Sequence, residues 1–178
     1  DGFKITGKRA LNGVIPVSGA KNAALPILIG TLVEKGEYII RNVPNLRDIR
    51  VLVKLLEDLG MTVEQINEND YKIINNGFRR NEASYEIVKK MRASFLVMGP
   101  MISNLNESVV SLPGGCAIGS RPVDLHIKGF EALGAHVDIA NGMISVEADE
   151  LIGSHIHMDV ISVGATINVI DRKSTRLN

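Results

Sequence analysis

The sequence predicts an α+β fold assembled from repeated units. Segments with helical and strand periodicity alternate along 178 residues, and apolar residues make up 45% of them, enough for a sizeable core. Ala93 and Gly99 also repeat Ala24 and Gly30 at one offset, 69 residues. Turns rich in Gly, Pro and Asn separate the segments. We therefore expect at least two copies of a helix–strand–helix–strand–strand unit.

The N-terminal segment predicts two short strands, residues 3–5 and 13–17, joined by glycine turns. The run SGAKNAALP then opens a helix of small and apolar residues that extends to about Val33. Ser18 is a candidate N-cap, and the N–H groups of the first turn beside Lys21 would attract an anion. The alternative, equally open at this point, is that Lys21 and Asn22 are solvated residues at a helix start.

The spacing of apolar residues, together with the Gly and Pro residues that end helices and strands, predicts the rest of the first unit. Apolar residues spaced by about 3.6 predict an amphipathic helix over Asn45–Leu59, which Gly60 ends. Pro44 closes the strand before this helix. The expected strands are Tyr38–Val43, Thr62–Ile66 and Tyr71–Ile74.

The second unit is longer than the first at one loop. The offset of 69 holds to Pro113, but Leu133-Gly134 repeats Leu59-Gly60 at an offset of 74. Five residues are therefore inserted between Pro113 and Arg121, and the chain's single cysteine, Cys116, lies among them. Because an enlarged loop on a repeated unit usually carries function, we interpret this insertion as part of a site.

A third copy begins at Ser162, where SVGAT resembles the first helix start, and its periodicity stops after Ile170. The polar ending, residues 171–178, does not continue the pattern, and we expect it to be foreign to the fold. A frayed native terminus is the alternative.

The cysteine loop has the composition of a reactive site. Glycines flank Cys116 on both sides, so the backbone is free to adopt positive φ and a ligand is able to approach closely. Only about 3% of an ordinary thiol is ionised at pH 7, and Arg121 and His126 are the nearby cations that would raise this fraction. The bland alternative is a small buried hydrophobic residue, which most lone cysteines are.

Other cations occupy comparable places in their units. Lys21 and Arg92 stand at small-residue helix starts, and Arg121 follows the strand that Pro113 closes. Such positions suit phosphate or carboxylate, although Arg92 alone is typical of a surface charge. His155 and His157 alternate along an expected strand, but without a third ligand at suitable spacing we expect no metal site.

The overall composition excludes several classes of function. Twenty basic and twenty acidic residues cancel, which disfavours binding to nucleic acid or to an anionic membrane surface. No run approaches the ~20 apolar residues that a membrane span needs, and DGFKITGKRA has no signal-peptide core. One cysteine allows no intrachain disulfide, which suits a reducing cytoplasm.

Three motifs together resemble one family. They are SGAKNAALP at 18–26, MRAS at 91–94 and LPGGCAIGSRPVDLH at 112–126. They closely resemble the UDP-N-acetylglucosamine enolpyruvyl transferases over residues 3–170. The sister enolpyruvyl-shikimate-phosphate synthases share the fold and the reaction type but have neither the cysteine loop nor the Lys-Asn opening.

The resemblance implies a role for each matching residue. Lys21 and Asn22 would meet phosphoenolpyruvate and the sugar, and Arg92 would hold the anionic substrates. Cys116 would be the general acid that protonates the methylene carbon of phosphoenolpyruvate, and the residue that fosfomycin alkylates. The nucleotide would contact Arg121, Pro122, Val123, Asp124, Leu125, Ser162, Val163 and Gly164. Some members have a lysine where Val160 stands here. The resemblance implies no metal and no cofactor.

The resemblance also implies an incomplete protein. Family members have about twice this length, in two domains that each hold three βαβαββ units in an inside-out α/β barrel. By this pattern residues 1–18 are opening strands that pack on the absent second domain, and residues 19–170 hold two units and the start of a third. We expect such a fragment to be inactive alone. The competing hypotheses are a nucleotide-sugar-binding remnant and a thiol-redox protein, which the lack of a resolving cysteine disfavours.

Overall fold

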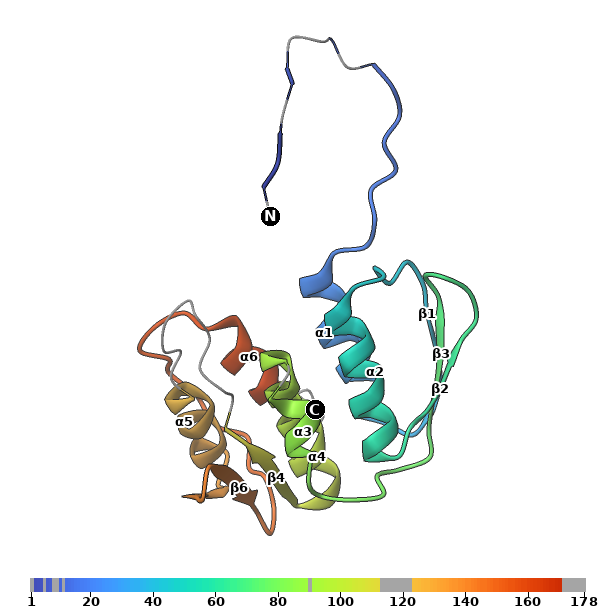
Figure 1. Cartoon of the computed structure of the whole chain (residues 1–178). Coiled ribbons are helices and arrows are strands. Elements are labelled where there is room, and N and C mark those ends of the chain that lie inside the picture. Colours follow the sequence, from blue (N-terminus) through green and yellow to red (C-terminus); the bar gives the residue numbers. More distant parts are fainter. Residues whose placement is uncertain are drawn as a thin grey trace.

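The computed structural model describes residues 2–4, 6, 7, 10, 12–89, 91–112 and 123–170. Over these residues the chain forms two similar α+β units and the first helix of a third (Figure 1). The cysteine insertion and residues 171–178 lie outside the described residues, so both predictions stay predictions.

The first unit is a three-stranded antiparallel sheet covered by two helices. Its strand order is β1-β3-β2, with Ile40 paired to Tyr71 and Gln65 paired to the same residue from the other side. In Figure 1 the sheet forms the right side of the molecule, and α1 and α2 lie against its inner face. The elements are α1 (Lys21–Gly30), β1 (Gly36–Ile40), α2 (Arg47–Leu59), β2 (Thr62–Gln65) and β3 (Tyr71–Asn75).

The second unit repeats this topology. Its strand order is β4-β6-β5, again antiparallel throughout. The helix that matches α1 is broken into a 3-10 segment followed by an α-helix. A short parallel bridge between Glu82 and Val109 adds a further extended segment beside β4. The elements are α3 (Tyr85–Val88), η1 (Arg92–Val97), α4 (Met98–Leu105), β4 (Glu107–Ser111), α5 (Asp124–Ala132), β5 (His136–Ala140) and β6 (Met143–Glu147).

Two helix ends confirm the predicted offset of 74. After α2, Gly60 adopts φ 112° and its N–H bonds to the carbonyl of Glu57, and the next N–H bonds to Leu56. After α5, Gly134 adopts φ 89° and its N–H bonds to Glu131. Both are left-handed glycine stops that satisfy the last helical carbonyls. The strands deviate slightly from the repeat. β4 begins at Glu107, two residues beyond the position that an offset of 69 from the start of β1 would give.

The two units share one hydrophobic core, to which helices of both units contribute. α1, α2 and α4 lie between the two sheets (Figure 1), α1 contacts η1, and α6 (Val163–Val169) packs against η1, α4 and α5. The largest fully buried side chains come from both units: Phe130, Leu28, Leu32, Ile49, Leu52, Leu55, Leu56, Leu59, Ile73, Met98, Met101 and Ile102. The helix over Asn45–Leu59 was therefore predicted correctly, apart from its first two residues.

The expected strand at residues 13–17 does not form within the described chain, whereas the packing of residues 1–18 on an absent second domain stays a prediction. Residues 12–20 form no strand, and Val14 and Val17 are 97% and 90% exposed. Strand pairing needs a neighbouring edge, and the described chain offers this segment none, because it runs away from both sheets (Figure 1). The expected strand through His155 and His157 is also wrong, since both lie exposed in an irregular segment.

Candidate functional site

The first candidate group stands at the start of α1. The helix begins at Lys21, not Ser18, and its N-cap is Ala20, which has no side chain able to cap. The N–H groups of Ala23 and Ala24 bond to the carbonyl of Ala20, and among the described residues none accepts from the N–H groups of Lys21 and Asn22. Ser18 as N-cap was therefore a wrong prediction.

The turn before α1 is set by Gly19. A Cβ atom on this residue would overlap the carbonyl oxygen of Asn42, just after β1. Only glycine allows the chain to pass this close to the first sheet. Lys21 then extends toward α2, where its Nζ lies 2.9 Å from Oδ2 of Asp48. The pair is partly exposed, so the lysine is held in place without being withdrawn from solvent.

The second candidate group stands at the start of α5. Asp124 is the first helical residue and is exposed, whereas Val123 and Leu125 are half-buried. The carbonyl of Val123 accepts from the N–H groups of His126 at 2.8 Å and Ile127 at 3.1 Å. The carboxylate of Asp124 therefore lies in the first turn, where negative charge is favoured. Arg121 and Pro122, predicted beside it, lie outside the described residues, as does Cys116.

The third candidate group stands at the start of α6. The Oγ of Ser162 accepts from the N–H of Ala165 at 3.2 Å, so this serine caps α6 in the way that Ser18 was expected to cap α1. Val163 is 71% exposed, and Gly164 lies against the imidazole of His126. α1 and α6 both begin on the upper side of Figure 1.

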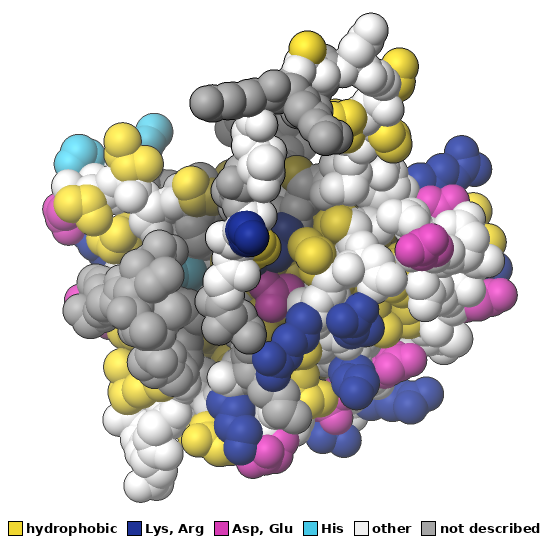
Figure 2. All heavy atoms as spheres, turned by 45° about the horizontal axis from the view of Figure 1, so that its top comes forward, with side chains coloured by type: hydrophobic (Ala, Val, Ile, Leu, Met, Phe, Trp, Pro, Cys, Tyr) yellow, Lys and Arg dark blue, Asp and Glu magenta, His cyan; other side chains and the backbone are white. Residues whose placement is uncertain are grey.

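These positions bring some of the predicted residues together. His126 directly follows Leu125 and contacts Gly164, so the segments 123–125 and 162–164 meet at one ring. Arg92 is the first residue of η1, and nothing is described of its side chain. Figure 2 turns the upper side forward and shows lysine and arginine side chains gathered to the right of centre, on the side of the first unit. Aspartate and glutamate side chains lie among them, so the charge on this side is mixed.

Sequence analysis gave His126 only a minor role, as one of two cations near Cys116. Its ring packs edge-on against Phe95, with centroids 4.9 Å apart and planes at 88°. Burial lowers its pKa from 6.5 to about 4, so the imidazole is neutral near pH 7. A neutral imidazole does not supply the cation expected near Cys116, but Cys116 lies outside the described residues, so its tuning stays a prediction. The motif PVDLH was the signal available, but burial of its histidine depends on α6.

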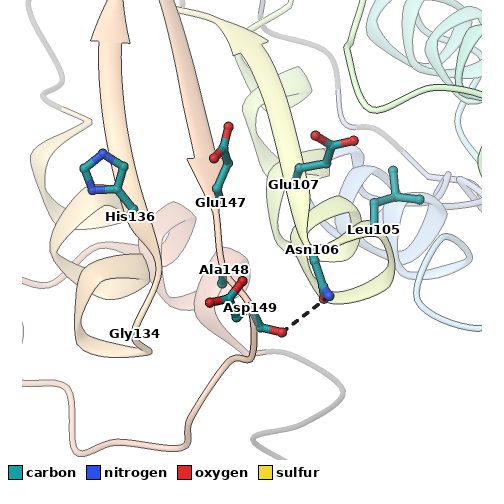
Figure 3. A pocket seen from close by; sticks show the side chains of 8 residues that line it. All are labelled: Leu105, Asn106, Glu107, Gly134, His136, Glu147, Ala148 and Asp149. Carbon is teal, nitrogen blue, oxygen red and sulfur yellow. Dashed lines mark hydrogen bonds between the residues drawn. The ribbon is translucent and has the colours of Figure 1, made fainter.

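A separate hollow in the described chain lies away from these three groups. It measures about 520 Å³ at the far end of the second sheet, and Glu107, Glu147 and Asp149 line it with His136 (Figure 3). Glu107 and His136 both pair with Glu147 across neighbouring strands. Three carboxylates disfavour a phosphorylated ligand, so this hollow does not fit the predicted substrates. Among the described residues no group of three His, Cys, Asp or Glu is arranged to hold a metal ion.

No helix in the described part of the chain is long and apolar enough to cross a membrane.

Comparison with known proteins gives relatives over almost the whole chain. A family model described as EPSP synthase (3-phosphoshikimate 1-carboxyvinyltransferase) matches residues 5–173. The UDP-N-acetylglucosamine 1-carboxyvinyltransferase of Dichelobacter nodosus is 47% identical over 168 residues, which are 94% of this chain and 40% of that protein. The protein of the same name from Acinetobacter baylyi is 47% identical over 174 residues, which are 96% of this chain and 41% of that protein. The chain thus spans about two fifths of the length of these relatives.

Solved structures match the fold. EPSP synthase from Acinetobacter baumannii superposes with a TM-score of 0.70 at 16% identity, over 92% of this chain and 38% of that one. The enolpyruvyl transferase NikO from Streptomyces tendae gives a TM-score of 0.69 at 16% identity, over 80% of this chain and 31% of that one. The two repeated units are therefore those of the enolpyruvyl-transferase fold, present here without a closed barrel.

Proposed function

The chain belongs to the EPSP synthase family of 1-carboxyvinyl transferases, and we propose that it is the N-terminal part of an enzyme that joins the enolpyruvyl group of phosphoenolpyruvate to the 3-hydroxyl of UDP-N-acetylglucosamine. Phosphate is released in this reaction. The observation that carries the proposal is the 47% identity, over 94% of the chain, to a protein named for this activity.

The candidate site supports the same chemistry. Free N–H groups and Lys21 at the start of α1 offer fixed positive charge to phosphoenolpyruvate. By the family resemblance, Asn22 would meet phosphoenolpyruvate and the sugar, and Arg92 would help to hold the anionic substrates. Cys116 donates a proton to the methylene carbon, and its glycine-rich loop lets the thiol reach that carbon. The uridine nucleotide lies along Arg121, Pro122, Val123, Asp124, Leu125, Ser162, Val163 and Gly164.

The arrangement of α5 and α6 favours UDP-N-acetylglucosamine over shikimate 3-phosphate. Segments 123–125 and 162–164 come from different units, yet they adjoin at His126. A nucleotide-sugar needs such an extended contact. In the cell the reaction is the first committed step of peptidoglycan synthesis in the cytoplasm, on which cell shape and cell division depend, and fosfomycin blocks it at Cys116.

Reassembly tests the proposal. The chain is mixed with the remaining C-terminal portion of the Dichelobacter nodosus relative, and phosphate release from phosphoenolpyruvate is followed. We expect release with UDP-N-acetylglucosamine, none with shikimate 3-phosphate, and none from the chain alone. The Cys116→Ala mixture should bind the nucleotide-sugar without turnover.

Two results would contradict the proposal. Release with shikimate 3-phosphate alone would identify the sister activity. A mixture that forms a stable complex and binds the nucleotide-sugar, yet releases no phosphate, would identify a binding remnant.

A further inference from the structure

α6 is held unusually close to two neighbouring helices. A Cβ on Gly99 of α4 would lie 2.5 Å from the backbone oxygen of Asn168, and one on Gly129 of α5 would overlap Cγ1 of Val169. Both glycines therefore allow contact between helices at backbone distance. α6, the first helix of the third unit, therefore packs closely against both α4 and α5 of the second unit.

The side-chain amide of Asn168 joins these helices. The residue is 1% exposed, and its Nδ2 donates to the carbonyl of Phe95 at 3.1 Å. Its Oδ1 accepts from the N–H of Gly99 at 3.0 Å. Phe95 and Gly99 span the junction where the 3-10 turn of η1 becomes the α-helix of α4, and a change of helix type disturbs the regular backbone bonding.

These two bonds fix which way the amide points. A backbone carbonyl only accepts and a backbone N–H only donates, so oxygen and nitrogen of Asn168 are not interchangeable here. The same Nδ2 lies 3.0 Å from Nδ1 of His126. An amide nitrogen only donates, so Nδ1 of His126 must accept. The neutral imidazole therefore carries its proton on Nε2.

The opposite edge of the ring faces the candidate site. A Cβ on Gly164 would lie 3.5 Å from both Cε1 and Nε2 of His126. His126 follows Leu125 directly, so this ring forms the contact between segments 123–125 and 162–164. Phe95 supports the ring edge-on from η1.

We propose that Asn168 is a positioning residue for the nucleotide-sugar: its amide keeps the proton of His126 on Nε2 and holds segment 162–164 beside segment 123–125. The inference rests on the proposed function for the identity of the ligand. The tautomer and the helix contact follow from the described bonds alone.

The tautomer is tested first, without ligand. In the full chain labelled with ¹⁵N-histidine, long-range proton–nitrogen spectra distinguish protonated from bare ring nitrogens. The chain has four histidines, and His126→Gln identifies the signals of interest. We expect a bare Nδ1 and a protonated Nε2 at pH 7. A protonated Nδ1 in the unaltered chain would overturn the inference, whatever the variants do.

Asn168→Asp tests the cause. The carboxylate has the same shape but only accepts, so it should draw a proton onto Nδ1 of His126. Asn141→Asp, in the exposed β5–β6 turn, is the matched control and should keep the original spectrum. An Asn168→Asp chain that stays folded by circular dichroism and keeps a bare Nδ1 would contradict the inference.

Binding completes the test in the reassembled protein. The dissociation constant for UDP-N-acetylglucosamine should rise roughly tenfold in Asn168→Asp and stay unchanged in Asn141→Asp. Equal affinity in both variants, with the tautomer switched, would overturn the positioning role and leave the proposed function intact. If the unaltered protein binds no nucleotide-sugar while Nδ1 is bare, the proposed function fails and the tautomer stands.

Discussion

The two units of this chain share one scaffold and differ where a site is expected. Both end their amphipathic helix with a left-handed glycine, and both order their strands in the same way. The first unit closes its last hairpin with a loop over residues 66–70, and the second uses the tight pair Asn141-Gly142. The first unit begins with an unbroken helix, α1, whereas in the second the matching helix changes type between Val97 and Met98, next to the bond between Gly99 and Asn168.

This comparison separates structural from functional demands. Leu56 and Phe130 occupy equivalent buried positions, and Gly60 and Gly134 both end a helix. Core packing and helix termination impose the same requirements on both units, so these positions agree between them. The broken helix and the five-residue insertion at Cys116 have no counterpart in the first unit, and both adjoin residues that we assign to substrates. The second unit therefore carries most of the specialised geometry, and the first supplies a simpler copy of the frame.

The largest effect is expected where the two cores correspond. Leu56 and Phe130 occupy equivalent helix positions, and both are at most 1% exposed. Leu56→Ala should lower the free energy of unfolding by about 2–5 kcal/mol and Phe130→Ala by about 3–5 kcal/mol, because each leaves a cavity. Chemical denaturation measures both. A loss below about 1 kcal/mol at one position would break the equivalence of the two cores.

Substitution of the two glycines that end α2 and α5 should change the free energy of unfolding by different amounts. At Gly60 a Cβ would lie 2.9 Å from the backbone nitrogen of Arg79, which is itself bonded to Leu59. At Gly134 the nearest atom is 3.8 Å away, so only the positive φ opposes a side chain. Gly60→Ala should destabilise by roughly 2–4 kcal/mol and Gly134→Ala by about 1 kcal/mol. Chemical denaturation measures both losses. Equal losses of unfolding free energy would contradict the difference in the space available to a Cβ at the two glycines.

Acid should weaken the second unit before the first. Burial lowers the pKa of His126 to about 4, so its contribution to stability is complete above pH 6.5 and is lost as the pH falls toward 4. In the first unit a hydrogen bond from Asn67, then one from the N–H of Asn42, lowers the pKa of Asp70. That contribution is present above pH 3.8 and is lost only below it.

Melting temperatures across the interval from pH 6.5 to 4 test this order. His126→Gln should flatten the decline, whereas Asp70→Asn should leave it unchanged in this interval. A decline that persists in His126→Gln would assign the acid sensitivity to other groups.

The smallest effect on stability is expected at Lys21. Its ion pair with Asp48 is partly exposed and contributes less than about 1 kcal/mol. Lys21→Met should therefore barely change unfolding, yet reduce phosphate release by the reassembled protein by roughly 100-fold or more. Asp48→Asn breaks the same pair and should retain most of the release. Equal losses in both variants would make the pair structural.

Local signals predicted much of this fold. The amphipathic helix before Gly60 and the helix start at Ser162 depend on nearby residues, and the sequence contains both signals. The opening strands find no pairing edge within the described chain, and no local sequence pattern reports where such an edge lies. The tautomer of His126 was likewise beyond prediction, because it depends on Asn168, 42 residues away. The motifs located segments 123–125 and 162–164, and only the helix packing brought them together.

Covalent labelling tests the central claim most directly. Fosfomycin is added to the reassembled protein with and without UDP-N-acetylglucosamine, and the modified peptide is located by mass spectrometry. Because glycines flank Cys116 and Arg121 lies near it in sequence, the account predicts a single adduct at Cys116 that forms faster when the nucleotide-sugar is bound. A protein that binds the nucleotide-sugar but carries no adduct at Cys116 would contradict the account.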